Sequence, residues 1–261
     1  MPARWTSVEE QSRFSELKCL YVRENLTIGQ IAQRLGIASQ TVFQRMRRLG
    51  IPSTPERKAT YAARRRLDIR LPKRSGALAE FFGIMLGDGH LAPYQIVVTL
   101  GTKEPAYADH VVRLLHSLFG VRPRIAIRKN NSRDVYLGSL TIVEWSQAEG
   151  LVHDKVRSQI SAPRWLFAKR EFLRSFLRGF FDTDGSVYRL RFGIQLSFTN
   201  KSLPMLHSVR RALIKLGYRP SRISVWRTYL TKRDEVIRFF KEIRPANQKH
   251  QERFAAFIKG R

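Results

Sequence analysis

Two stretches of the chain end in the same way: LAEFFGIMLGDGHL, residues 78–91, and FLRSFLRGFFDTDGSVY, residues 172–188. Each is an apolar run that stops at an aspartate followed by glycine, at Asp88 and at Asp184. These aspartates are 96 positions apart, and Gly120 and Gly217, which follow a later amphipathic segment in each copy, are 97 apart. Offsets that agree this closely indicate a duplication. Each copy is predicted to run helix, two strands, helix, two strands, helix.

Small residues four positions apart lie in both apolar runs: Gly83 and Gly87 in the first, Gly179 and Thr183 in the second. Small residues at this spacing form a flat stripe on a helix and let two backbones approach closely. We therefore expect the two helices to pair side by side and to bring the two aspartates together at their carboxyl ends.

The paired aspartates are hard to explain by structure alone. A carboxylate at the carboxyl end of a helix faces the negative end of the helix dipole, and two adjacent carboxylates repel each other. A divalent cation compensates both effects, and Mg²⁺ commonly uses one or two carboxylates together with phosphate oxygens and water. The sequence predicts a Mg²⁺ site, with Mn²⁺ as a substitute. Its candidate metal-binding residues are Asp88, Asp184, Gly87 and Thr183.

Three residues beside the motifs have expected structural roles. Gly89 and Gly185 are predicted to supply the turn that stops each helix. Asp182 has Leu86 as its counterpart in the first copy, and an acid present in one copy only predicts a local hydrogen-bond acceptor.

Composition limits the partners. The 261 residues are 43% apolar and carry a net charge of +27 spread along the chain, which indicates a globular protein with a polyanionic partner, nucleic acid first. Cys19 is the one cysteine, so no intrachain disulfide is predicted. No apolar run reaches the ~20 residues of a membrane span, and the N-terminus lacks the core of a signal peptide. We expect a cytoplasmic protein, organellar in a eukaryotic host, that is not secreted and has no membrane partner.

The segment LTIGQIAQRLGIASQTVFQRMRRLGI, residues 26–51, predicts a helix-turn-helix. Thr27 is placed to cap its first helix, Gly36 to make the turn, and Ser39 to cap its second helix. An ordinary small helical hairpin is the alternative. The outward residues of the second helix that suit base edges and phosphates are Gln40, Thr41, Gln44 and Arg45.

The predicted fold class is α+β: a small all-α domain followed by a duplicated core. We place a helix-turn-helix domain at 1–55, a basic linker at 56–75, a first half at 76–162 and a second half at 163–261. The linker contains prolines and many basic side chains, and is predicted to touch phosphates, although a solvated charge run would look the same.

Alternation in RLRFGIQLSFT, residues 189–199, predicts one strand with an apolar face and a polar face. The strand around residues 95–100 shows a weaker version of this pattern. Such polar faces in a basic chain favour a DNA platform over an ordinary solvated sheet. The candidate DNA-contacting residues of the core are Gln95, Thr99, Arg124, Arg128, Arg189, Arg191, Gln195, Ser197, Thr199, Arg222 and Arg227.

FFGIMLGDG and LRGFFDTDG resemble the paired motifs of the LAGLIDADG homing endonucleases, and the resemblance covers about residues 75–261. It implies two αββαββα halves that form a saddle of strands on double-stranded DNA. It also implies a monomer that cleaves both DNA strands, with Mg²⁺, across the minor groove of a long and nearly asymmetric site. Each aspartate would serve one strand.

The resemblance further implies a polar residue in each pocket and a basic residue near it. Asn200, in TNK, and Thr102, in GTK, match the polar position; Thr102 is shorter than the usual residue, so that half would use water instead. Lys155, in GLVHDK, and Lys249, in PANQK, match the basic position. With Asp88 and Asp184 these four complete the candidate catalytic set. Each lysine could equally be a phosphate contact.

A second class of function uses the same fold without cleavage: a maturase that binds intron RNA, or a transcription regulator, which the helix-turn-helix favours. A structural chromatin-like protein fits least, because it needs no paired carboxylates. Inteins carry the same domain, but Met1 and Arg261 do not fit the nucleophile and the asparagine expected at the ends of an intact intein. We expect the helix-turn-helix to extend the DNA footprint.

Overall fold

The computed structural model describes residues 7–51, 66, 68–129, 131–191 and 193–259. The chain divides into two compact units, Met1–Ala63 and Arg64–Arg261, and each is described by itself. Most of the predicted basic linker, 52–65 and 67 included, lies outside the described residues. Within the described part of the chain, no helix is long and apolar enough to cross a membrane.

In the described part of the first unit, residues 7–51, the regular structure is helical. Its helices are α1 (Ser7–Lys18), the π-helical turn η1 (Cys19–Arg23), α2 (Ile28–Leu35) and α3 (Ser39–Arg48). Thr27 caps α2 as predicted, since its hydroxyl accepts from the Gln30 N–H at 3.3 Å and the Gln30 side chain accepts from the Thr27 N–H at 2.8 Å. Gly36 ends α2 in the left-handed region, with φ 63°. The prediction that Ser39 caps α3 is wrong: Ala38 holds that position, and Ser39 is the first helical residue.

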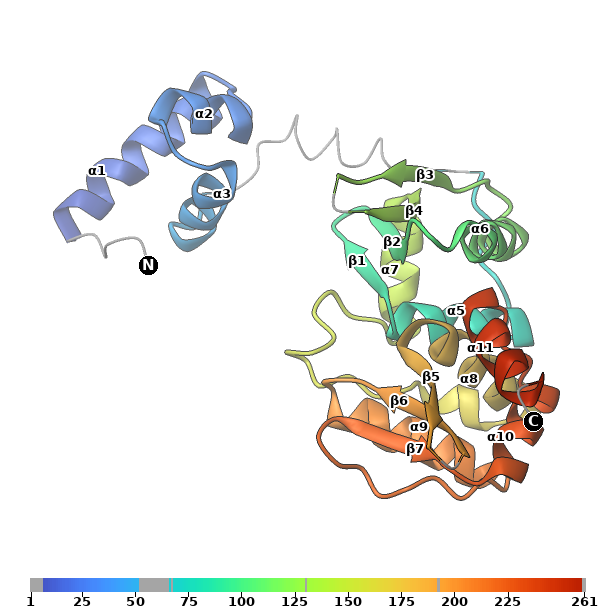
Figure 1. The fold of residues 1–261 in the computed structure, drawn as a ribbon. Coiled ribbons are helices and arrows are strands. Elements are labelled where there is room, and N and C mark those ends of the chain that lie inside the picture. Colours follow the sequence, from blue (N-terminus) through green and yellow to red (C-terminus); the bar gives the residue numbers. More distant parts are fainter. Residues whose placement is uncertain (1–6, 52–65, 67, 130, 192, 260–261) are drawn as a thin grey trace. The chain divides into compact units, whose positions relative to one another are not determined.

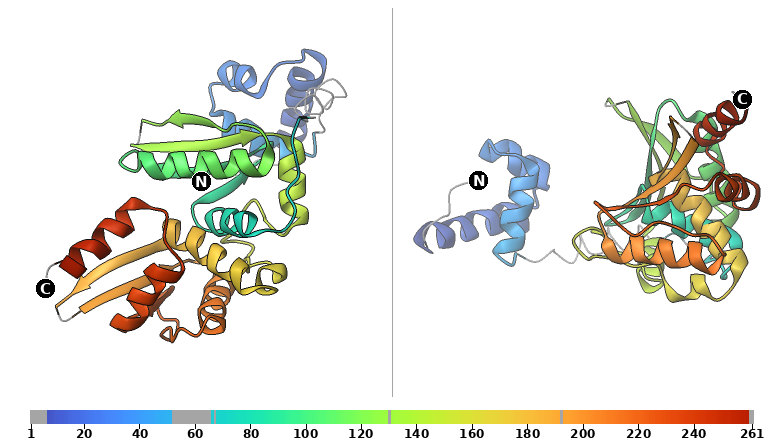
Figure 2. Two further views of the ribbon diagram at one scale, coloured as in Figure 1. Left: turned by 90° about the vertical axis from the view of Figure 1, so that its right-hand side faces the viewer. Right: turned by 60° about the horizontal axis from the view of Figure 1, so that its bottom comes forward.

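The second unit contains two halves of similar build (Figures 1 and 2). The first half consists of α5 (Gly76–Leu86), β1 (Gly89–Ala92), β2 (Gln95–Gly101), α6 (Pro105–Phe119), β3 (Arg124–Ile127), β4 (Ser132–Gly138) and α7 (Leu140–Ala148). Its antiparallel sheet has the order β1-β2-β4-β3. This half has the αββαββα order that the sequence predicts.

The second half departs from that order. It follows the 3-10 turn η2 (Arg164–Phe167) and consists of α8 (Arg170–Asp184), β5 (Gly185–Leu190), β6 (Gly193–Thr199), α9 (Leu203–Lys215), β7 (Arg227–Leu230), α10 (Arg233–Glu242) and α11 (Gln248–Lys259). Its sheet has the order β5-β6-β7. Where the first half has a fourth strand, residues 221–224 meet β7 through the isolated bridge between Ser224 and Arg227.

The single strand predicted for residues 189–199 is wrong. Residues up to Leu190 belong to β5 and residues from Gly193 to β6, and these two positions pair across a tight hairpin. The apolar residues alternate without a break from β5 into β6, so the sequence pattern does not reveal the turn. In the structure Ile194 of β6 is buried, whereas Leu190, at the end of β5, is 45% exposed. Phe192, which the alternation places on the apolar face, lies outside the described residues.

Helices α5 and α8 pack directly against each other at the centre of the second unit (Figure 1). A Cβ atom placed on Gly83 would overlap the carbonyl oxygen of Phe176, and one placed on Gly179 would overlap the carbonyl oxygen of Glu80. Only glycine permits this backbone contact. Aromatic residues of both helices, Phe81, Phe82, Phe176 and Phe180 among them, are fully buried around it.

Each central helix leads straight into a strand. Gly185 caps α8 as predicted and opens β5, whereas Gly87 caps α5 and Gly89 opens β1, so the prediction is wrong at Gly89. Neither Gly89 nor Gly185 has a positive φ. Their glycine character has another cause. A Cβ on Gly89 would press on the backbone of Met85, and one on Gly185 would press on the backbone of Phe181.

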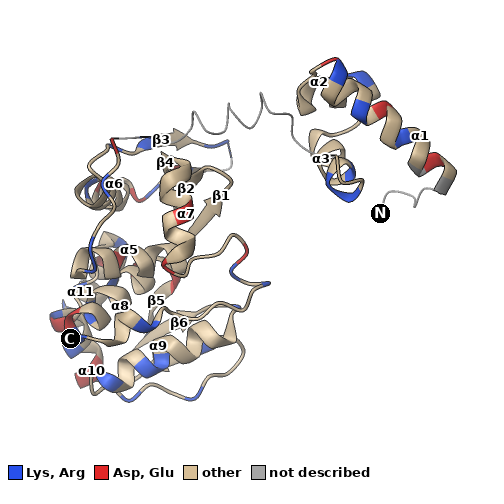
Figure 3. Cartoon of the chain, turned by 180° about the vertical axis from the view of Figure 1, so that it is seen from behind, with Lys and Arg blue, Asp and Glu red and all other residues tan. Residues whose placement is uncertain are grey.

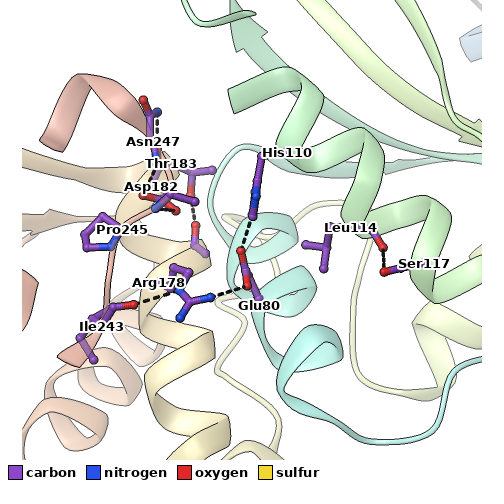
Figure 4. A network of polar contacts seen from close by, with 12 residues as sticks. Glu80, His110, Leu114, Ser117, Arg178, Asp182, Thr183, Ile243, Pro245 and Asn247 are labelled. Carbon is purple, nitrogen blue, oxygen red and sulfur yellow. Dashed lines mark hydrogen bonds and ion pairs between the residues drawn. The ribbon is translucent and has the colours of Figure 1, made fainter. Parts of the chain in front are cut away.

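A buried acid ties three helices together (Figure 4). Glu80 of α5 is 5% exposed, and its carboxylate meets His110 Nε2 of α6 at 2.6 Å. It also accepts from Arg178 of α8 at 3.2 Å, and Arg178 Nε donates to the carbonyl oxygen of Ile243 at 2.9 Å. A buried carboxylate with these partners keeps the helix pair in one arrangement.

Candidate functional site

The two motif aspartates lie where the central helices end. Asp184 is the last residue of α8, and Asp88 follows the residue that caps α5. Burial raises the pKa of the Asp184 carboxyl to about 7, and the negative charge of Asp88 adds to the rise, whereas Asn200 and Lys155 lower it. Gly87, the residue before Asp88, lies beside the carboxyl group of Asp184, so the two aspartates belong to one site and their charges interact.

Asn200 fixes the carboxylate of Asp184. Its Nδ2 donates to Asp184 Oδ2 at 2.7 Å, and its Oδ1 accepts from the Ser202 N–H at 2.8 Å. Its own backbone N–H donates to the carbonyl oxygen of Trp226 at 3.1 Å. Held at these three atoms, Asn200 has little freedom to change its orientation.

Lys155 provides a positive charge between the two aspartates. Its Nζ donates to the carbonyl oxygens of Met85 at 3.0 Å and Leu86 at 3.3 Å, and also to that of Gly87. These carbonyls lie at the negative end of α5, where the helix can no longer satisfy its last C=O groups. Burial lowers the pKa of Lys155, and the charges of Asp184 and Asp88 raise it.

Asp88 has a different set of neighbours. Asp88 reaches the solvent, but the loss of water around its carboxyl group raises the pKa of Asp88. The positive charges of Lys155 and Lys249 lower this pKa, and the negative charge of Glu104 raises it. Glu104, the residue before α6, accepts from Lys249 Nζ at 2.7 Å and from Asn247 Nδ2 at 3.2 Å. Glu104 was not identified in the sequence.

Thr102, assigned by sequence to the pocket of Asp88, makes other contacts. Its hydroxyl donates to the carbonyl oxygen of Asn131 at 3.1 Å. Glu104 takes the place expected for Thr102. A simple count would have found it, because Glu104 follows Asp88 by 16 positions and Asn200 follows Asp184 by 16 positions.

Asp182 anchors the segment that carries Lys249. It is 1% exposed, and its carboxylate accepts from the backbone N–H groups of Ala246 at 2.9 Å and Asn247 at 3.0 Å (Figure 4). The Asn247 side chain returns a bond to the carbonyl oxygen of Asp182 at 3.0 Å. Asp182 is a hydrogen-bond acceptor as expected, but its partners lie 64 and 65 positions away along the chain, just before α11.

Each aspartate is approached by a lysine from the other half of the second unit. Asp184 and Asn200 belong to the second half and meet Lys155 from the first, whereas Asp88 and Glu104 belong to the first half and are approached by Lys249 from the second. The two pockets are therefore related but not identical: an amide partners one aspartate, and a carboxylate lies near the other.

The donor set fits a hard divalent cation bound by few protein atoms. Among the described residues, no group of three or more His, Cys, Asp and Glu side chains could hold a metal. The available oxygens are the two carboxylates and backbone carbonyls, a set that Mg²⁺ completes with phosphate and water. Gly87 and Thr183, the other predicted ligands, face each other between the helices, and the Gly87 carbonyl accepts from Lys155.

The predicted DNA-contacting residues differ in exposure. Exposed are Gln40, Gln44, Arg124, Arg128, Arg189, Arg191, Arg222 and Arg227. Half-buried are Thr41, Arg45, Gln95, Thr99, Gln195 and Thr199. Ser197 is fully buried, and its hydroxyl lies 3.3 Å from that of Thr199, so the prediction that it faces outward is wrong.

One acid on the first sheet was also missed. Asp134 of β4 is 5% exposed, and it accepts from Thr99 Oγ1 at 2.9 Å and from Arg128 Nε at 2.7 Å. It pairs with Thr99 in the register of the sheet, which holds both predicted contacts in place. Elsewhere the basic side chains are spread over helices of both units (Figure 3).

Residues 171–244, which include the second aspartate motif, match the family described as LAGLIDADG-like domain.

Curated relatives match small parts of much longer proteins. The replication factor C small subunit of Thermococcus kodakarensis is 34% identical over 112 residues, which is 42% of this chain and 12% of that protein. The replication factor C small subunit of Pyrococcus horikoshii is 27% identical over 183 residues, 70% of this chain and 20% of that protein. This chain thus spans at most about a fifth of the length of these two relatives.

Solved structures with a similar fold are more distant in sequence. Full-length DUF199/WhiA from Thermatoga maritima is 16% identical, with a TM-score of 0.48, over 74% of this chain and 63% of that one. I-DmoI in complex with DNA and Ca is 19% identical, with a TM-score of 0.47, over 64% of this chain and 88% of that one. I-DmoI with DNA and Mn gives the same TM-score and identity over 96% of that chain.

Proposed function

We propose that the chain is a site-specific endonuclease, because residues 171–244 match the family described as LAGLIDADG-like domain and a second helix followed by Asp-Gly packs against the first helix of that segment. It hydrolyses phosphodiester bonds in both strands of double-stranded DNA, as a monomer, at a long asymmetric site. The observation that carries this proposal is the pair of aspartates at the ends of α5 and α8, each with its own polar partner and a lysine from the other half.

We assign roles to the chain's own residues. Asp88 and Asp184 bind Mg²⁺, or Mn²⁺ in its place, and each serves one DNA strand. When bound, the cation activates water and stabilises the charge that develops on the phosphate. Asn200 holds the carboxylate of Asp184 in orientation, and Lys155 and Lys249 stabilise negative charge near each aspartate.

DNA binding rests on the exposed arginines of both sheets and on α3. The polar residues Gln40 and Gln44 on the open face of α3 suit base edges, and the arginines at the strand ends suit phosphates. We propose that the helical unit lengthens the DNA contact, as a helix-turn-helix would, and that the protein acts in the compartment that holds its DNA.

Plasmid cleavage tests this proposal. A plasmid library of randomised targets is incubated with the purified chain and Mg²⁺, with EDTA in parallel, and with the variant Asp184→Asn. Linear product that requires both Mg²⁺ and Asp184 is expected, and sequencing its ends gives the target. Linear product that persists with EDTA or with Asp184→Asn contradicts the proposed site.

One observation favours a protein that binds nucleic acid without cutting it. The ammonium group of Lys155 lies on the carbonyl oxygens at the end of α5, where it already offers the aspartates a positive charge. A regulator or an intron RNA maturase needs no more than that. Tight, salt-sensitive binding of DNA or RNA with no product in the cleavage assay would support this second function.

A further inference from the structure

The hairpin before β7 has an unusual tip. Ser224 and Arg227 exchange backbone hydrogen bonds of 2.9 and 3.0 Å, so the turn between them consists of Val225 and Trp226 alone. Both residues have positive φ, 44° and 62°. A two-residue turn with this geometry normally contains Asn-Gly or Asp-Gly, because those residues adopt positive φ at little cost.

A β-branched residue and a large aromatic residue are both strained in this conformation. Burial does not compensate the strain, since Val225 is 83% exposed and Trp226 is 45% exposed. Turns that keep such strain at the surface are typical of ligand-binding positions. The tip therefore presents apolar side chains to something outside the chain.

The surroundings of the tip are basic. Arg222 and Arg227 flank it, and both are exposed. The matching hairpin of the first half has a similar composition: Arg124 and Arg128 flank Ile127, which is 77% exposed. An apolar tip between cations fits a polyanion with flat apolar surfaces, and duplex DNA has both its phosphates and its stacked bases.

The tip is also connected to the candidate site. The carbonyl oxygen of Trp226 accepts the backbone N–H of Asn200 at 3.1 Å. The side chain of Asn200 in turn donates to the carboxylate of Asp184 at 2.7 Å. Movement of the tip would therefore reach the aspartate through one residue.

We propose that Val225 and Trp226 form an apolar wedge that inserts at a base step of duplex DNA, with the Trp226 ring stacked on a base. Proteins that use such wedges unstack a step and contact more of the bent duplex. Because Trp226 holds Asn200, the inserted wedge also fixes the orientation of Asp184. The inference rests on the DNA binding proposed above, and it does not require cleavage.

Tryptophan fluorescence tests the wedge directly. Binding of a long mixed-sequence DNA duplex is followed by anisotropy in EDTA, so that no DNA is cut. The emission of wild type minus that of Trp226→Phe isolates Trp226 from the other three tryptophans. The Trp226 emission is expected to be quenched at saturation; an unchanged emission on bound duplex would overturn the proposal, as would a failure to bind duplex.

A double variant separates binding from folding. Val225→Asn with Trp226→Gly gives the residues that this turn prefers, so the melting temperature should rise by about 2–4 °C. Duplex affinity should nevertheless fall about ten-fold, the loss typical of one stacked base. The matched control Ile214→Ala removes another exposed apolar side chain, on α9, and should leave affinity unchanged. Equal affinity of the double variant and wild type would contradict the wedge.

The two proposals fail in different ways. Quenching of Trp226 without any cleavage in Mg²⁺ would keep the wedge and refute the nuclease. Cleavage in Mg²⁺ with unquenched Trp226 would keep the nuclease and refute the wedge.

Discussion

Gly83 and Gly179 meet across the contact between α5 and α8, each against the backbone of the opposite helix. The contact lies one to two helical turns before Asp88 and Asp184. The separation of these two backbones therefore determines the separation of the two carboxylates, and any side chain at the contact would change both.

Alanine at either glycine should destabilise the chain. The added Cβ overlaps a backbone carbonyl oxygen that cannot move without moving its helix, so Gly83→Ala or Gly179→Ala should cost at least about 2 kcal/mol. Urea unfolding measures this. Gly193→Ala is the matched control, because its Cβ meets nothing within 4 Å and should change stability by less than about 0.5 kcal/mol. Equal effects of the three variants would refute the close contact.

Removal of Lys155 should make folding depend on Mg²⁺. Without its ammonium group, the two aspartates and the carbonyl oxygens at the end of α5 lose a buried cation. Lys155→Met should then lose about 1–3 kcal/mol of stability in EDTA. Mg²⁺ should restore part of that loss, seen as a larger rise in melting temperature than in wild type. The exposed Lys232→Met serves as the control, and an equal Mg²⁺ response in all three proteins would argue against a cation site here.

Glu104 should affect catalysis more than stability. Its ion pair with Lys249 is partly exposed, so Glu104→Gln should cost no more than about 1 kcal/mol. The variant frees Lys249 and removes a charge near Asp88, so the strand served by Asp88 should be cut about ten-fold more slowly. Accumulation of nicked plasmid would show this. Glu16→Gln, which breaks the exposed pair with Arg13, should leave the ratio of nicked to linear product unchanged.

Asp182 should be needed for folding around α11. Its two carboxylate oxygens each accept a backbone N–H, and Asp182→Asn turns one acceptor into a donor that faces another donor. We expect a loss of about 1–3 kcal/mol in thermal or urea unfolding. Asp154→Asn, which removes the charge of a surface carboxylate that accepts the Arg157 N–H in a turn, should cost less. If the two variants lose the same free energy of unfolding, the hydrogen bonds of Asp182 do not stabilise the fold around α11.

His250 should make the fold sensitive to acid. It is fully buried, and burial together with the charge of Lys249 lowers the pKa of His250 to about 3. In the unfolded chain the pKa is about 6.5, so between these values the unfolded chain binds a proton that the folded chain does not. The free energy of unfolding should fall as pH drops through this window, by up to about 1.4 kcal/mol per pH unit.

The variant His250→Leu isolates this contribution. It should remove one proton from the pH dependence of unfolding below pH ~6.5, because leucine cannot take up the charge. His207→Leu, at an exposed position on α9, is the control. An unchanged pH dependence in His250→Leu would show that another group titrates.

The central helix pair and its two aspartates could be predicted because the signal is local and occurs twice. Asp134 could not be found that way, since its partners are Thr99 of the neighbouring strand β2 and Arg128 just beyond β3. Glu104 could have been found from its 16-position offset, but its pairing with Lys249, from the far end of the chain, could not. Thr102 was chosen by matching the letters GTK to TNK, but it lies 14 positions after Asp88, whereas Asn200 lies 16 positions after Asp184. The hairpin at Leu190 was missed because alternating patterns continue through tight turns.

The supply of each aspartate with a lysine from the other half has a consequence for the chain as a whole. Lys155 lies in the connection between the halves and Lys249 near the C-terminal end, so a cut after Lys155 would leave each fragment with an aspartate but without the lysine of the other half. Each fragment would also carry a bare, glycine-lined helix that only the other can cover. The protein is thus suited to assembly from two separately produced pieces, and activity recovered on mixing them would report that they had met.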